Sequence, residues 1–392
     1  MKSLKSGWLL RVTPLLAVAL FVAGCGSKGI VRTPAKLVDI AHPQVQPRQL
    51  WSRSIGNGSG GNYPAFRIAA EQDAVYVGAE DGDVAAYNPK TGGTIWRTDT
   101  HARLISGPTV NGDAVLLGTL DAQVIALNRA DGKRLWKSDT SSEVMAPPVS
   151  DGRVVVVRSV DGRIFGLNAS SGKRIWSFDR DEPSLTLRGQ SAPLFEGGNV
   201  LVGLDNGDVI SLNSQDGKLA WEQNLSVATG RTQLDRLVDI DADLLSSSVG
   251  VFVVSYGGDI ALLDPTSGQP RWKRRVKSYN SMALSGDGRT LYVTDDDGYV
   301  WALDTTTGAQ VWKQEVLKYR RLSPPVWFDG FIVVGDYDGY LHWLEPSDGK
   351  IVGRTRLSSD PIIAPPVVAN GLLYVMDSDG DLAAYKKGAP AG

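Results

Sequence analysis

The segment Asp131-Gly-Lys-Arg-Leu-Trp136 and its near copy Ser171-Gly-Lys-Arg-Ile-Trp176 share a Gly that stands four residues before a Trp. A seventh, altered copy begins at Gly349 and has Gly353 in the Trp position, and Trp51 lacks the preceding Gly. Successive Trp positions are 40 to 51 residues apart, a period typical of solenoids and propellers. The complete pairs are Gly92/Trp96, Gly132/Trp136, Gly172/Trp176, Gly217/Trp221, Gly268/Trp272 and Gly308/Trp312.

Each period has the pattern of four short strands. In one copy, the apolar segment 146–149 is followed by the β-branched run 154–157, by 164–168 and by 173–176, with Gly-containing turns between them. Gly in a two-residue hairpin turn accepts the positive φ that such a turn requires. The middle two strands recur eight times without helical periodicity. The sequence therefore predicts an all-β protein, an eight-bladed β-propeller of four-stranded antiparallel blades.

Closure of the ring is predicted from the two ends of the chain. The eighth repeat, 364–386, contains three strands and then stops, whereas Trp51 marks a single strand near the N-terminus. Pairing that strand with the last three would complete the eighth blade and cover exposed strand edges. We therefore place the propeller at 50–386 and a C-terminal tail at 387–392. The Trp side chains are expected to pack between blades and not to stack on a ligand.

The N-terminus has the pattern of an export signal. Three basic residues precede an apolar run, 15–23, that is too short to span a bilayer comfortably. The run ends in Val22-Ala-Gly-Cys25, and Cys25 is the only cysteine of the chain. This stretch resembles a bacterial lipobox, which implies a signal peptide at 1–24 and lipidation of Cys25. A single cysteine also excludes a disulfide framework.

The residue after Cys25 suggests a destination. Lipoproteins kept at the inner membrane usually have Asp at that position, whereas this chain has Gly26. The resemblance therefore implies a lipid anchor in the outer membrane of a Gram-negative bacterium, with the protein facing the periplasm. Residues 25–49 contain three prolines and little periodicity, and we expect them to form a lipidated flexible tether. The net charge of −2 provides no basic surface for nucleic acid.

Three loops interrupt the repeat: 56–61, five extra residues within 181–189, and eleven extra residues within 226–243. The last two lie in consecutive connections between blades and should emerge side by side on one face, where function is concentrated on such scaffolds. Leu185 and Leu187, next to Arg188, suit a protein interface. The alternative is that both leucines fold back onto the blades.

Several segments together resemble the BamB family, the β-propeller lipoproteins of the outer-membrane β-barrel assembly (BAM) machinery. They are the lipobox, the eight repeats, Ser184-Leu-Thr-Leu-Arg-Gly-Gln-Ser-Ala-Pro193, Ala228-Thr-Gly230, Leu234-Asp-Arg-Leu237 and Gly339-Tyr-Leu-His-Trp343. The resemblance implies a non-catalytic scaffold that binds the POTRA domains of BamA and assists insertion of β-barrel proteins. The family residues that contact BamA match Leu185, Leu187, Arg188, Asp239 and Asp241. Direct contact with nascent outer-membrane proteins is left open.

The repeats are also compatible with two other functions. The repeats also resemble those of periplasmic quinoprotein dehydrogenases, which use pyrroloquinoline quinone (PQQ) and Ca²⁺, but the vicinal Cys pair that many of them carry is missing. A small ligand in the central channel is the second alternative. The Asp-rich turns 295–298, 336–339 and 377–380 are explained as hairpins, since they lack the spacing of a Ca²⁺ loop. No catalytic, cofactor-binding or metal-binding residue is predicted.

Overall fold

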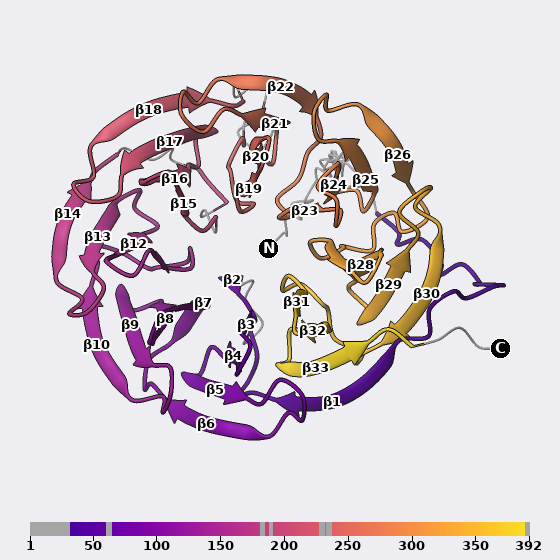
Figure 1. The fold of residues 1–392 in the computed structure, drawn as a ribbon, viewed down its shortest axis with the longest axis horizontal. Coiled ribbons are helices and arrows are strands. Elements are labelled where there is room, and N and C mark those ends of the chain that lie inside the picture. Colours follow the sequence, from indigo (N-terminus) through magenta and orange to yellow (C-terminus); the bar gives the residue numbers. More distant parts are fainter. Residues whose placement is uncertain are drawn as a thin grey trace, which may run out of the picture. The chain divides into compact units, whose positions relative to one another are not determined.

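The computed structural model describes residues 32–59, 65–180, 185–187, 191–226, 232 and 237–388. The chain divides into two compact units, Met1–Thr33 and Pro34–Gly392, and the propeller lies in the second. Eight β-sheets surround a central axis within this unit, as Figure 1 shows. The predicted eight-bladed, all-β propeller is therefore confirmed. Among the described residues, no helix has the length and hydropathy needed to cross a membrane.

The strands of blades 1 to 4 follow the chain from the inner to the outer edge of each sheet. Blade 1 contains β3 (Ala69–Ala70), β4 (Val75–Gly78), β5 (Asp83–Tyr87) and β6 (Thr94–Asp99). Blade 2 contains β7 (Leu104–Asn111), β8 (Ala114–Thr119), β9 (Gln123–Asn128) and β10 (Arg134–Asp139), and β2 (Ala65–Phe66) pairs with β7 in parallel as a fifth strand. Blade 3 contains β11 (Val149–Ser150), β12 (Val154–Arg158), β13 (Ile164–Asn168) and β14 (Arg174–Phe178). Blade 4 contains β15 (Leu194–Glu196), β16 (Asn199–Gly203), β17 (Asp208–Asn213) and β18 (Leu219–Asn224).

Blades 5 to 7 repeat this order, and blade 8 combines both ends of the propeller. Blade 5 contains β19 (Leu245–Ser247), β20 (Gly250–Val254), β21 (Asp259–Leu263) and β22 (Pro270–Arg275). Blade 6 contains β23 (Ala283–Leu284), β24 (Thr290–Thr294), β25 (Val300–Asp304) and β26 (Gln310–Gln314). Blade 7 contains β27 (Val326–Phe328), β28 (Phe331–Gly335), β29 (Tyr340–Leu344) and β30 (Ile351–Arg356). Blade 8 contains β31 (Val367–Ala369), β32 (Leu372–Met376), β33 (Asp381–Lys386) and, as its outer strand, β1 (Arg48–Ser54).

The Trp side chains fasten each blade to the next. The indole Nε1 of Trp96 in blade 1 donates a hydrogen bond to the carbonyl of Arg129 in blade 2, at 2.9 Å. Its ring lies on Gly132, where an added Cβ would come within 2.5 Å of the Trp96 Cε3 atom. The same Trp-to-carbonyl bond recurs from Trp51, Trp136, Trp176, Trp221, Trp272 and Trp312 to the following blade. The predicted structural role of the Trp residues is confirmed, and the Gly of each pair serves the Trp of the preceding blade.

The hydrophobic core lies between the blades. One buried cluster, for example, joins Val124 and Trp136 of blade 2 to Val155 and Phe165 of blade 3. Because a four-stranded sheet cannot cover its own two faces, each blade is stabilised mainly by its neighbours.

Closure of the ring occurs as predicted. β1 pairs antiparallel with β33, and Trp51 lies opposite Ala384. Trp51 is buried and donates to the carbonyl of Pro89 in blade 1 at 2.9 Å. Figure 1 shows the indigo β1 beside the yellow β33.

Residues 34–47, which we call the N-terminal strap, pack on blade 7. The amide of Ala35 donates to the carbonyl of Lys318 at 2.9 Å, and Arg354 Nη1 donates to the carbonyl of Val38 at 2.9 Å. Further along, the Gln44 amide donates to Val352 at 2.8 Å, and Val45 is buried. The sequence predicts a flexible tether over residues 25–49. Residues 34–47 of that segment are instead held on the propeller by hydrogen bonds and by the buried Val45, which their proline content does not indicate.

The loops of the propeller lie at two ends of the ring. The hairpin between the second and third strands of a blade lies at the same end as the connection to the next blade, because successive strands alternate in direction. We call this end the connection face. The two long connections singled out from the sequence, after β14 and after β18, both belong to it.

Candidate functional site

Leu185 and Leu187 lie on the connection face between blades 3 and 4 and remain accessible. Their exposed fractions are 40% and 37%, values well above those of core leucines. The alternative in which both leucines fold back onto the blades is not what the structure shows. Arg188, which was predicted beside them, lies outside the described residues.

A buried carboxylate holds residues 185–187, which we call the leucine loop, in place. The amide of Leu187 donates a hydrogen bond to Asp239 Oδ2, which joins the connection after β14 to the connection after β18. Asp239 is completely buried. The sequence correctly suggested that the two long connections lie side by side. The resemblance implies that Asp239 contacts BamA, and the structure places its buried carboxylate on the Leu187 amide.

Burial shifts the pKa of Asp239 away from its ordinary value. Loss of solvent raises its pKa to about 6, and the neighbouring Asp205 acts in the same direction, whereas the Leu187 amide and Arg158 oppose the change. Its carboxylate is therefore costly to keep ionised above that pH. Functional sites often contain buried ionisable groups that lower the stability of the fold. Asp239, which orients an exposed loop, is a group of this kind.

Asp205 was missed from the sequence. Carboxylate oxygens of Asp205, Asp239 and Asp241 lie within 4.8 Å of one another, and Asp205 forms a buried ion pair with Arg158 of blade 3. Asp205 occupies a hairpin turn like those of other blades, so its sequence gave no signal. With Arg158 on Asp205 and the Leu187 amide on Asp239, these acids have protein partners, and the cluster alone does not define a metal site.

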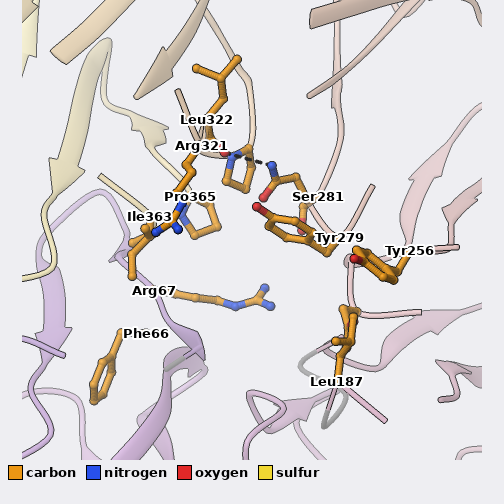
Figure 2. A pocket seen from close by; sticks show the side chains of 14 residues that line it. Phe66, Arg67, Leu187, Tyr256, Tyr279, Ser281, Arg321, Leu322, Ile363 and Pro365 are labelled. Carbon is orange, nitrogen blue, oxygen red and sulfur yellow. Dashed lines mark hydrogen bonds between the residues drawn. The ribbon is translucent and has the colours of Figure 1, made fainter. Parts of the chain in front are cut away.

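A pocket of about 430 Å³ opens beside Leu187 around the central axis. Figure 2 shows Leu187, Tyr256 and Tyr279 on one side of it and Ile363 with Pro365 on another. Its wall combines aromatic, aliphatic and charged groups, which suits a side chain of a binding partner. The lining residues are Phe66, Arg67, Leu187, Asp241, Tyr256, Tyr279, Asn280, Ser281, Arg321, Leu322, Pro324, Ile363, Ala364 and Pro365.

An ion pair at this pocket, whose lining includes Arg67, joins segments of distant blades. Arg67 follows β2, whose pairing with β7 brings it inward, and its guanidinium makes a two-point contact with Asp243 before blade 5. The Nη2–Oδ1 distance is 2.6 Å. The Ala192 amide also donates to Asp243, at 2.9 Å, which links the pair to blade 4. No pattern in the sequence indicated this contact.

The Asp-rich turns are hairpins, as expected. Asp295 Oδ1 accepts the amides of Asp297 at 3.1 Å and Tyr299 at 2.9 Å, and the other two turns repeat this arrangement. These backbone contacts use the carboxylates that first resembled Ca²⁺ ligands.

The chain matches the family model described as outer membrane protein assembly factor BamB at residues 80–314 and 306–389. It is 46% identical to BamB of Pseudomonas aeruginosa over 322 residues, which covers 82% of this chain and 84% of the relative. It is 35% identical to BamB of Escherichia coli over 338 residues, with coverages of 83% and 84%.

Among solved structures, BamB from Moraxella catarrhalis matches with a TM-score of 0.79 and 26% identity, over 87% of this chain and all of that one. A quinohemoprotein alcohol dehydrogenase of Pseudomonas putida matches with a TM-score of 0.70 at 13% identity, over 92% of this chain and 79% of the enzyme. At 13% identity this match shows a shared fold only, and it carries no information about the chemistry of the present chain.

Proposed function

Because this chain belongs to the BamB family of outer membrane protein assembly factors, we propose that it is a non-catalytic subunit that docks on the POTRA domains of BamA. In this proposal, Cys25 carries the lipid anchor in the outer membrane and the propeller faces the periplasm. The leucine loop and the pocket beside it form the docking site, and Arg188 and Asp241 flank it.

The observation that carries the proposal is the combination of an exposed Leu187 side chain and a fixed Leu187 backbone. A backbone position that is already held by a hydrogen bond loses little conformational entropy on binding, so the apolar contacts of its side chain count more fully toward affinity. Interfaces of this kind concentrate their binding energy in a few apolar anchors that insert beside a pocket. The 430 Å³ pocket that Leu187 lines could accept one large side chain of the partner.

The test is capture of BamA from detergent-solubilised outer membranes by the tagged, lipidated chain. Replacing Leu185 and Leu187 together by Ser should reduce the recovered BamA by about fivefold or more, since two apolar anchors contribute roughly 1–3 kcal/mol. Ile175→Ser is the matched control, because Ile175 is 49% exposed on β14 of the same blade. Undiminished capture by the double variant, with its melting temperature preserved, would show that the docking site lies elsewhere.

Two substitutions of Asp239 distinguish a role in positioning Leu187 from direct contact with BamA. Asp239→Asn retains an oxygen that accepts the Leu187 amide and should preserve most of the capture, whereas Asp239→Ala removes the acceptor and should weaken it. Equal loss in both variants would instead indicate that the charge itself is required.

A further inference from the structure

The point where the chain leaves the propeller toward Cys25 is fixed on the connection between blades 6 and 7. Ala35 is held at both of its backbone groups: its amide donates to the Lys318 carbonyl at 2.9 Å, and its carbonyl accepts from Arg320 Nη1 at 3.0 Å. Arg320 is itself buried and paired with Asp336 at 2.7 Å. The strap is thus attached to the connection between β26 and β27, which lies on the connection face.

The strap shortens the distance over which the anchor can act. Cys25 lies ten positions before Ala35, and at about 3.5 Å per step the chain between them reaches no further than roughly 35 Å. Without the strap contacts the free segment would extend to β1 and could reach about 80 Å. A lipid at Cys25 therefore keeps this part of the connection face near the bilayer surface.

Aromatic rings and cations, all partly buried, lie together beside the attachment point, next to the acidic turn 295–297, where Asp295 accepts a hydrogen bond from the indole of Trp301 at 2.7 Å. Lys313 Nζ lies 3.7 Å from the ring centroid of Tyr299 and 4.7 Å from that of Trp301. Lys318 Nζ lies 4.9 Å from the ring of Tyr319 and 5.5 Å from that of Tyr299. We call the two lysines and the three aromatic residues the blade 6 patch. Trp and Tyr with nearby Lys are the side chains enriched where proteins meet the headgroup region of a membrane.

Additional basic residues border the patch. Arg274 of β22 lies over the Trp301 ring, with its guanidinium carbon 5.9 Å from the centroid. The sequence Lys273-Arg-Arg-Val-Lys277 continues the positive charge along the outer edge of blade 5. Acidic neighbours are present as well: Glu315 pairs with Lys313 at 3.0 Å, and Asp259 lies within 4.0 Å of bases on β22.

The equivalent surface of blade 7 is built differently. His342 and Arg354 occupy the strand positions that Trp301 and Lys313 occupy in blade 6, since each pair lies cross-strand at the same place in its blade. There the strap covers the blade, and Arg354 donates to the Val38 carbonyl. In blade 6 the neighbouring Val316 is 38% exposed and available to a partner.

We propose that the blade 6 patch contacts the phospholipid headgroups of the membrane to which the chain is anchored, beside the point where the strap leaves the propeller. This inference rests on the lipidation of Cys25 within the proposed function. The contact would orient the connection face, including the leucine loop, relative to the bilayer. Zwitterionic and anionic glycerophospholipids match the patch, because both offer phosphate groups to Lys and Arg and an interfacial layer to Trp and Tyr.

The test uses the full lipidated chain bound to vesicles of phosphatidylethanolamine and phosphatidylglycerol. Since Cys25 is the only cysteine and lipid blocks its thiol, Val316→Cys can be labelled with a fluorophore at one position. Val368→Cys is the matched control: it is the same residue type, 37% against 38% exposed, and lies before the β31–β32 turn at the opposite end of the ring. Headgroup-nitroxide lipids should quench the label at 316 several-fold more strongly than the label at 368.

A second pair of measurements separates this contact from partner docking. Lys313→Glu with Lys318→Glu should lower the quenching at 316 several-fold while leaving capture of BamA unchanged. Equal quenching at 316 and 368, or quenching at 316 that survives the double charge reversal, would overturn the membrane contact. Because the vesicles contain no BamA, a negative quenching result would contradict the membrane contact and leave the proposed docking on BamA intact. The docking is tested by the capture of BamA with the leucine variants.

Discussion

Trp343 lies opposite Gly353 in the pairing of β29 with β30, so blade 7 reverses the arrangement of the other blades. In blade 2, for example, the Trp is on the outer strand and Ala126 on the third strand lies opposite Trp136. In blade 7 the Trp has moved inward and is completely buried. The space outside Gly353 is taken by Val45 of the strap, whose carbonyl oxygen would come within 2.8 Å of a Cβ at position 353.

The first prediction concerns that contact. Gly353→Ala should destabilise the propeller by about 1–3 kcal/mol, because a Cβ would meet the Val45 backbone and the Trp343 side chain, an overpacked position. It should also release the strap, so that trypsin cleaves after Lys36 faster than in the parent chain. Gly93→Ala is the control, since a Cβ there meets only Thr91 at 3.3 Å. Unchanged protection of Lys36 would mean that the strap does not depend on Gly353.

The second prediction concerns closure by β1. Trp51→Ala should lower the free energy of unfolding by about 3–5 kcal/mol, the usual cost of truncating a buried Trp. Leu50→Ala on the same strand should change it by less than about 0.5 kcal/mol, because Leu50 is 37% exposed. Urea denaturation followed by fluorescence would measure both. Similar losses in the two variants would contradict the role of Trp51 as the fastening between blades 8 and 1.

The third prediction concerns pH. The pKa of Asp239 is about 6 in the folded chain against an ordinary value of 3.8, so between these values the folded state binds more protons than the unfolded state. Stability contributed by this group therefore falls as pH rises through that window. Asp239→Asn removes the cost and should be more stable than the parent by up to roughly 2–3 kcal/mol at pH 7.5, with little difference near pH 4. Melting temperatures across this range would test it, and a pH-independent difference would contradict it.

The fourth prediction concerns the ion pair between Arg67 and Asp243. A double-mutant cycle with Arg67→Met and Asp243→Asn should give a coupling energy of about 1 kcal/mol, since both side chains keep partial contact with water and the geometry is two-point. Salt should reduce this coupling. Additive effects of the two substitutions in urea denaturation would show that the contact contributes no net stability.

The periodic features of this fold could be predicted from the sequence because they are local and repeated. Turn glycines, β-branched strands and the Gly/Trp spacing each specify the same blade several times over, and the missing strand of the last repeat identifies the partner of Trp51. The two long connections were recognised because they break the period.

The remaining contacts depend on packing between segments that share no pattern. Arg158 with Asp205, Arg67 with Asp243, and Val45 with Gly353 each join distant parts of the chain through a single side chain. The burial of Asp239 likewise follows from how two irregular loops meet, and nothing in the spacing of their residues encodes it.

The fastening by Trp has a direction. Each indole belongs to one blade and each receiving Gly to the next, so the blades are joined head to tail, like subunits of a cyclic oligomer whose contacts are heterologous. The Gly turn that blade 8 would offer to blade 7 is missing, because β33 and β1, its third and fourth strands, are not consecutive in the chain. A circular permutant that connected β33 to β1 through a Gly turn and opened another Gly turn would therefore lose one Trp contact between blades, and its new turn would face the Trp-free position of blade 7. Such a permutant should form the ring with lower stability, and the strap would have to be retained to fill the joint beside Gly353.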